Sequence, residues 1–142
     1  MQKFITNSVE ETIELGIKLG KTLKGGTVVA FFGGLGMGKT AFTRGIAKAL
    51  CVTEEVSSPT FAIVNDCGGN PPLYHFDMYR VETWEDLYSS GFFDFYEAGG
   101  VLAVEWSENI ENALPENTIR VEFQRGDSDN QRIITIDGGD LI

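Results

Sequence analysis

One run of the sequence, Gly33-Gly-Leu-Gly-Met-Gly-Lys-Thr40, has the residue types and spacing of a phosphate-binding loop. It matches the pattern G-x-x-x-x-G-K-[ST] between an apolar run and a predicted helix. Glycines let backbone N–H groups turn toward an anion, and the N-terminus of the following helix adds partial positive charge. Lys39 can reach the β- and γ-phosphates of a nucleotide, and the hydroxyl of Thr40 can ligate Mg²⁺. The predicted binding residues are Gly33, Gly34, Leu35, Gly36, Met37, Gly38, Lys39 and Thr40.

A loop of this kind works with an acidic residue at the end of a neighbouring apolar strand. Glu105 and Asp77 each end such a run, and both are candidates. A third acid, Asp66, opens a D-x-x-G sequence, which GTPases use to contact the γ-phosphate. However, the chain contains no Asn-Lys pair and so no guanine-reading N-K-x-D segment, and the residues after Asp66 are typical of a turn. We therefore predict an ATP site and favour Glu105 as the acid beside magnesium.

Apolar periodicity predicts the elements that position these residues. Ridges of apolar residues and a capping box formed by Ser8 and Glu11 favour a first helix at 9–23. Strands and helices then alternate, which is typical of an α/β domain. The predicted strands are 27–32, 61–64, 73–78, 101–104, 119–124 and 133–136, and the further helices are 39–50, 83–89 and 92–97.

We expect residues 1–142 to form a single P-loop ATPase domain of three layers. Its central sheet is expected to be mainly parallel, because strands and helices alternate. The last two strands flank a polar turn at 126–130, which predicts a C-terminal β-hairpin at one edge of the sheet.

Composition limits the classes of function. The 142 residues carry a formal net charge of −10, and the 11 basic residues are scattered along the sequence. Direct, tight nucleic-acid binding is therefore not expected of the chain alone. The acidity either serves solubility or offers a surface for a basic partner protein. The sequence lacks an apolar run of membrane-spanning length, a signal-peptide pattern and metal-type cysteine spacing, so we expect a cytoplasmic protein without membrane association.

Three further segments join the phosphate loop in a recognisable set. Gly34–Thr40, Ser58-Pro-Thr-Phe61, His75-Phe-Asp-Met-Tyr-Arg80 and Val104-Glu-Trp106 occur in the order and spacing of the bacterial TsaE (YjeE) family, which the chain resembles over nearly its whole length. The resemblance implies an ATPase needed to make threonylcarbamoyladenosine, a modified base next to the anticodon of tRNAs. Proteins of this family do not transfer the group themselves but support a TsaB–TsaD pair.

The resemblance also implies roles for individual residues. Glu105 resembles a Walker B-type acid that positions magnesium and the attacking water, and Asp77 resembles the second acid near the metal. Thr60 would face the phosphates from a loop that closes over the nucleotide. Trp106 would lie beside the site, and Arg132 would be a basic residue near the nucleotide.

Two positions depart from the family pattern. Gly34 stands where the family usually has Asp, which affects loop rigidity or partner contact. Ala41 stands where the family commonly has Thr, at a position that contacts the α-phosphate. We expect alanine to weaken this contact.

His75 is interpreted as structural, and Arg80 is equally suited to a salt bridge or a phosphate contact.

The expected mechanism is positioning and charge neutralisation, with Glu105 or Asp77 orienting water. Because the sequence offers no evident arginine finger, we expect slow hydrolysis by the chain alone and faster hydrolysis with a partner. Two alternatives stay open. A small-molecule kinase would share the loop but needs an acceptor pocket and a basic lid, and a nucleotide-dependent binding module would act without significant turnover.

Overall fold

A computed structural model describes residues 1–33, 38–52 and 64–138 of the chain. The predictions for Gly34, Leu35, Gly36, Met37 and Thr60 lie outside these described residues. Most of the predicted strand at 61–64 lies outside them as well.

The described strands form one seven-stranded sheet. They are β1 (Gln2–Thr6), β2 (Thr27–Phe32), β3 (Val64–Gly68), β4 (Leu73–Asp77), β5 (Val101–Glu105), β6 (Ile119–Arg125) and β7 (Arg132–Asp137). Their order across the sheet is β1-β7-β6-β2-β5-β4-β3. The four central strands run parallel, as predicted, whereas the β1–β7, β6–β7 and β3–β4 pairs are antiparallel. The fold is therefore a mixed α/β sheet with a parallel centre.

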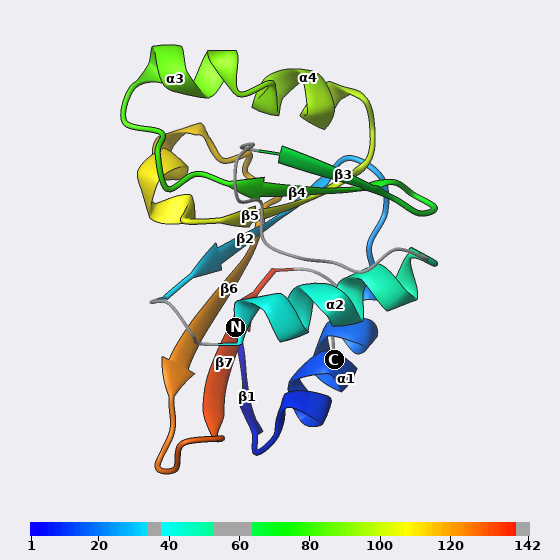
Figure 1. The fold of residues 1–142 in the computed structure, drawn as a ribbon, viewed down its shortest axis with the longest axis vertical. Coiled ribbons are helices and arrows are strands. Elements are labelled where there is room, and N and C mark those ends of the chain that lie inside the picture. The colour runs from blue at the N-terminus through cyan, green and yellow to red at the C-terminus, as the bar shows by residue number, and fades with distance from the viewer. Residues whose placement is uncertain (34–37, 53–63, 139–142) are drawn as a thin grey trace.

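Helices cover both faces of this sheet (Figure 1). They are α1 (Val9–Gly20), α2 (Lys39–Ala49), α3 (Trp84–Ser89), α4 (Phe92–Glu97) and the 3₁₀ helix η1 (Ser107–Ala113). One apolar core joins α1 and α2 to the sheet, and a second core joins α3, α4 and η1 to the opposite face. β5 contributes alternate residues to both cores, and the side chains of Val101–Val104 are fully buried. A strand buried on both faces explains the continuous apolar run in the sequence.

Glycines let α1 and α2 pack with their backbones in contact. A Cβ atom placed on Gly16 would collide with the carbonyl oxygen of Phe42, and one placed on Gly45 would collide with that of Ile13. The start of α1 is capped by Ser8, whose Oγ accepts a hydrogen bond from the backbone N–H of Glu11 at 3.1 Å. The expected capping box is shifted by one residue, because the Glu11 carboxylate accepts from the N–H of Asn7 instead of Ser8.

Three features differ from the sequence-based predictions. First, the C-terminal hairpin of β6 and β7 is present but is not at the edge, because β1 pairs with β7 and covers it. β1 is short and was not predicted. Second, the 3₁₀ helix η1 follows β5, and it was not predicted because its residues show no helical periodicity of apolar side chains. Third, β3 extends through Asp66 to Gly68, so part of the predicted turn is strand, and its pairing with β4 is antiparallel.

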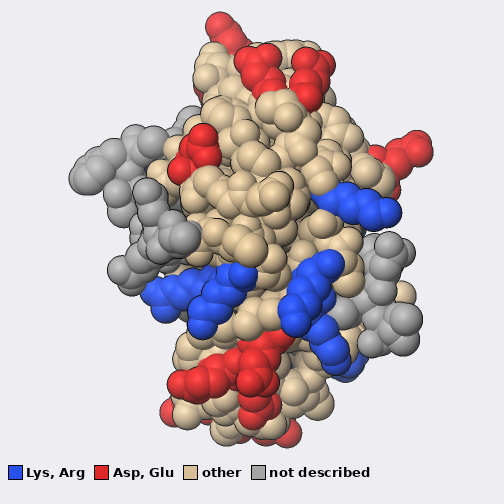
Figure 2. Space-filling view, turned by 90° about the vertical axis from the view of Figure 1, so that its right-hand side faces the viewer, with Lys and Arg blue, Asp and Glu red and all other residues tan. Residues whose placement is uncertain are grey.

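The surface charge is unevenly distributed. On the side of the molecule shown in Figure 2, Lys and Arg side chains gather in a band across the middle, and Asp and Glu side chains lie above and below it. None of the described helices combines the length and the apolar character that crossing a lipid bilayer requires.

Because of the α1–α2 contact, we expect Gly45→Ala to destabilise the protein, although alanine favours helices more than glycine does. Intrinsic helix propensity alone would make Gly45→Ala stabilising by about 1 kcal/mol. Because the new Cβ would collide with the backbone of α1, we expect the free energy of unfolding to fall by about 1–3 kcal/mol. Urea unfolding measures this change. Lys48→Ala, at an exposed position of the same helix, is the control and should change stability little; a Gly45→Ala variant more stable than the parent would contradict the packing account.

Candidate functional site

The carboxyl ends of three neighbouring parallel strands meet at one edge of the sheet. β5 lies between β2 and β4, and Asp77 at the end of β4 is directly opposite Glu105 at the end of β5. The two carboxylates therefore project to the same face of the sheet, because cross-strand partners share a face. Ala103, two residues before Glu105, packs in the core beneath α1 and α2, so this is the face that α2 covers. Both predicted acids thus lie where the chain leaves β2 for α2.

Lys39 connects the two described ends of the predicted phosphate loop. It is the first residue of α2 and is 6% exposed. Its Nζ donates a hydrogen bond to the carbonyl oxygen of Gly33 at 2.5 Å and lies 5.4 Å from the centre of the Trp106 ring. The cation is therefore held over an aromatic face beside the end of β5.

The loop reaches α2 through a backbone conformation that favours glycine. Gly38, the N-cap residue of α2, has φ = 95°, and Gly33 has φ = 124°. A Cβ on Gly33 would also lie 2.6 Å from the carbonyl oxygen of Phe123. Since Gly38 has no side chain to cap the helix, the first amides of α2, including those of Thr40 and Ala41, are not capped by it. A helix N-terminus of this kind suits an anion.

Glu105 is held by both its backbone and its side chain. Its carbonyl oxygen accepts a hydrogen bond from the N–H of Met78 at 3.0 Å. Its Oε2 lies 2.6 Å from Nε2 of His75, which is fully buried, while the Glu105 side chain is 12% exposed. Asp77 is held differently, because its Oδ1 accepts from the N–H of Tyr79 at 2.9 Å and caps the turn that follows β4.

Arg132, the most distant predicted residue, also comes close to the loop. A Cβ placed on Gly38 would lie 3.8 Å from Cγ of Arg132. Nη1 of Arg132 donates to the carbonyl oxygens of Asp129 and Gln131, at 2.7 and 2.9 Å. The pairing of β7 with β6, which itself pairs with β2, brings this arginine to the start of α2.

Two contacts at this edge were not predicted. Oε2 of Glu108 in η1 accepts a hydrogen bond from the N–H of Gly33 at 3.3 Å. Nδ2 of Asn109 donates to the carbonyl oxygens of Met78 and Tyr79, at 2.8 and 3.2 Å, and so ties η1 to the end of β4. Neither residue belongs to a recognisable sequence pattern, so only the fold could reveal them.

Asp66, the acid of the D-x-x-G sequence, lies away from this edge. It is opposite Tyr74 in the antiparallel β3–β4 pair, three positions before Asp77. Its Oδ1 accepts from the N–H of Gly68 at 3.0 Å. Asp66 thus lies within β3, where the sequence predicted a turn, and its side chain binds the backbone N–H of the last residue of that strand.

The donor set suits magnesium better than a transition metal. Among the described residues, no group of three or more His, Cys, Asp or Glu side chains could hold a metal by itself. Mg²⁺ usually binds one or two carboxylates and completes its shell with water and phosphate oxygens. The paired carboxylates of Asp77 and Glu105 and the hydroxyl of Thr40 provide oxygen donors of this kind. These residues therefore fit a magnesium ion that arrives with a nucleotide.

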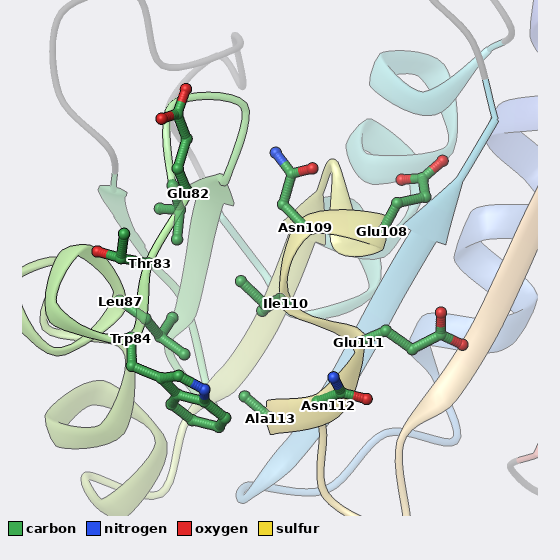
Figure 3. A pocket seen from close by; sticks show the side chains of 11 residues that line it. Glu82, Thr83, Trp84, Leu87, Glu108, Asn109, Ile110, Glu111, Asn112 and Ala113 are labelled. Atoms are coloured by element: carbon green, nitrogen blue, oxygen red, sulfur yellow. The ribbon is translucent and has the colours of Figure 1, made fainter.

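A pocket of about 340 Å³ lies beside this edge (Figure 3). It is bounded on one side by the segment that begins α3, including Trp84 and Leu87, and on the other by η1, with Ile110 at its base. Glu108, at its rim, points toward the end of β2. Among the described residues, none of the predicted nucleotide-binding residues lines the pocket, although Glu108 at its rim accepts the hydrogen bond from Gly33.

Comparisons with known proteins agree on one family. The family model described as "Threonylcarbamoyl adenosine biosynthesis protein TsaE" matches residues 6–134. The chain belongs to the TsaE family. Proteins named "tRNA threonylcarbamoyladenosine biosynthesis protein TsaE" from Treponema pallidum and Bacillus subtilis are 36% and 38% identical to it. These alignments cover 93% and 92% of the chain, and 97% and 82% of the two relatives.

A solved structure extends this agreement to the fold. The crystal structure of Bacillus subtilis YdiB superposes with a TM-score of 0.77 at 31% sequence identity, covering 99% of the chain and 85% of YdiB. The TsaE family resemblance inferred from the sequence motifs is therefore confirmed.

The contact between Lys39 and Trp106 predicts an optical signal. An anionic ligand that draws Lys39 away from the Gly33 carbonyl changes the surroundings of the Trp106 ring. We expect the tryptophan emission to change when Mg²⁺ and ATP are added. The chain has 2 tryptophans, so Trp84→Phe should keep this change and Trp106→Phe should abolish it. A response carried by Trp84 instead would contradict the ATP site that the sequence predicts beside Lys39.

Proposed function

We propose that this TsaE-family chain binds ATP with Mg²⁺ at the carboxyl edge of β2, β5 and β4 and hydrolyses it slowly. In this proposal residues 1–142 act as one P-loop ATPase domain in the biosynthesis of threonylcarbamoyladenosine on tRNA, a cytoplasmic process. The chain supports a TsaB–TsaD-like protein pair that transfers the group. The observation that carries the proposal is the alignment of Asp77 with Glu105 beside the strand-to-helix turn that bears Lys39.

Each residue in this site has a separate role in the proposal. The amides at the start of α2 and the Nζ of Lys39 bind the phosphates, after Lys39 leaves the Gly33 carbonyl. Thr40, Glu105 and Asp77 would hold Mg²⁺, which when bound offsets negative charge on the phosphates. Glu105 or Asp77 also orients the attacking water. Gly34, Leu35, Gly36, Met37, Ala41 and Thr60 complete the proposed contacts with the nucleotide.

The arrangement of arginine supports slow turnover by the isolated chain. Phosphoryl transfer is strongly accelerated when an arginine stabilises charge in the transition state. Arg132 lies near Gly38, but its Nη1 already donates to two backbone carbonyls in the β6–β7 turn. A partner that supplies a cation or repositions Arg132 would raise the rate. In this proposal the TsaB–TsaD pair is that partner.

The phosphate contact of Lys39 is tested by its removal. Charge-assisted hydrogen bonds contribute about 1.5–3 kcal/mol, so Lys39→Ala should weaken ATP binding roughly tenfold to a hundredfold. Equilibrium titration with a fluorescent ATP analogue measures the dissociation constant. Lys48→Ala removes an exposed lysine from the other end of α2 and should leave affinity unchanged. Equal affinities for all three proteins would remove the phosphate-loop assignment.

The whole proposal is tested by ATP hydrolysis measured with and without a purified TsaB–TsaD pair. We expect slow hydrolysis of ATP alone, a higher rate with the pair, and little hydrolysis of GTP. Glu105→Gln should still bind ATP but lose most of the rate in both conditions. Phosphate transfer to a metabolite would instead support a small-molecule kinase. Full support of threonylcarbamoyladenosine formation by Glu105→Gln would favour a binding module without turnover.

A further inference from the structure

The buried histidine of β4 is placed to act on the proposed site through another residue. His75 is fully buried and so cannot touch a nucleotide, yet its Nε2 lies 2.6 Å from Oε2 of Glu105, whose side chain reaches the surface. The register explains this contact. His75 pairs with Ala103, two residues before Glu105, so both side chains lie on the same face of adjacent strands.

The contact requires a particular arrangement of hydrogen atoms. A carboxylate that binds a metal is ionised and can only accept hydrogen bonds, so in the proposed site it is Nε2 of His75 that donates to Glu105. The other ring nitrogen, Nδ1, is buried and has no hydrogen-bond partner among the described residues. A buried polar atom without a partner lowers stability. An apolar side chain of similar size would avoid this cost, so packing alone gives no reason for a histidine here.

We propose that His75 is a positioning residue that fixes the orientation of the Glu105 carboxylate. With Oε2 held by the buried ring, the carboxylate keeps one orientation at the edge of the sheet where the magnesium-bound nucleotide is proposed to lie. The backbone of Glu105 is fixed at the same time by Met78, which donates to its carbonyl oxygen at 3.0 Å. Residues that orient a metal ligand in this way typically affect metal affinity or activity about 10- to 100-fold.

This inference rests on the proposed function but makes a separate claim. The proposed function requires that Mg²⁺ raise the affinity for ATP in the parent protein. The role of His75 requires that this gain, and the hydrolysis rate, depend on a hydrogen-bond donor at position 75. A residue that only fills the core would alter stability without altering the magnesium dependence of binding.

Two substitutions separate the donor from the bulk of the ring. His75→Leu removes the donor and replaces the ring with an apolar side chain of similar size. His75→Gln keeps an N–H donor near the position of Nε2. For His75→Leu we expect a loss of about tenfold or more in kcat and in the Mg²⁺-dependent gain in affinity, with ATP binding in EDTA unchanged. His75→Gln should recover most of both quantities.

A double-mutant cycle with Glu105→Gln tests whether His75 acts through Glu105. If it does, His75→Leu should lower neither the rate nor the magnesium-dependent gain further in a protein that already carries Glu105→Gln. The thermal unfolding temperature of His75→Leu should stay near that of the parent, since this substitution also removes the buried Nδ1 that has no partner among the described residues.

The outcomes distinguish the two claims. A parent protein whose ATP affinity does not respond to Mg²⁺ would overturn the proposed function. A parent that responds, with His75→Leu responding equally and hydrolysing at the same rate, would overturn the role of His75 alone. Equal losses in His75→Leu and His75→Gln would also overturn it, because the shape of the ring and not its N–H donor would then be responsible.

Discussion

The parallel pairing of β5 with both β2 and β4 is the constraint on which the site depends. Val101–Val104 are fully buried from both faces of the sheet, so the strand needs helices on each side and ends at its first charged residue, Glu105. Because neighbouring strands are parallel, their carboxyl ends meet at the same edge. Asp77 and the glycine turn after β2 come to Glu105 as a result. The apolar core therefore determines where the carboxylates emerge.

The position of the N-terminus of α2, where the predicted phosphate loop ends, depends on the contact between α1 and α2. Gly16 and Gly45 let the two helices pack with their backbones in contact, which fixes α2 against the sheet. The N-terminus of α2 then lies at the end of β2, with Gly38 in a left-handed conformation at the junction. Lys39 is buried at this point and contacts both Gly33 and Trp106. Two distant close-packed glycines thus contribute to the geometry of the proposed phosphate site.

The sequence predicted those helices and strands whose apolar pattern lies within a single segment of the chain. Apolar runs predicted β2, β4 and β5, and helical periodicity predicted α1 and α2 to within a few residues. It could not reveal β1, whose five residues gain their partner only when β7 returns from the other end of the chain. The contacts of Glu108 and Asn109 were missed for the same reason, since each joins η1 to residues distant in the sequence. His75 was interpreted as structural, and only the register of β4 against β5 reveals its bond to Glu105.

The most direct test of the account is a crystal structure of the chain with Mn²⁺ in place of Mg²⁺ and a non-hydrolysable ATP analogue. Anomalous scattering would locate the metal independently of the nucleotide density. We predict the metal at the carboxyl edge of β5 and β4, with the Thr40 hydroxyl and a carboxylate of Glu105 or Asp77 in its direct or water-bridged shell. Lys39 should have left the Gly33 carbonyl for a phosphate oxygen. A nucleotide bound in the pocket between α3 and η1, with the carboxylates of Asp77 and Glu105 distant from the metal, would contradict it.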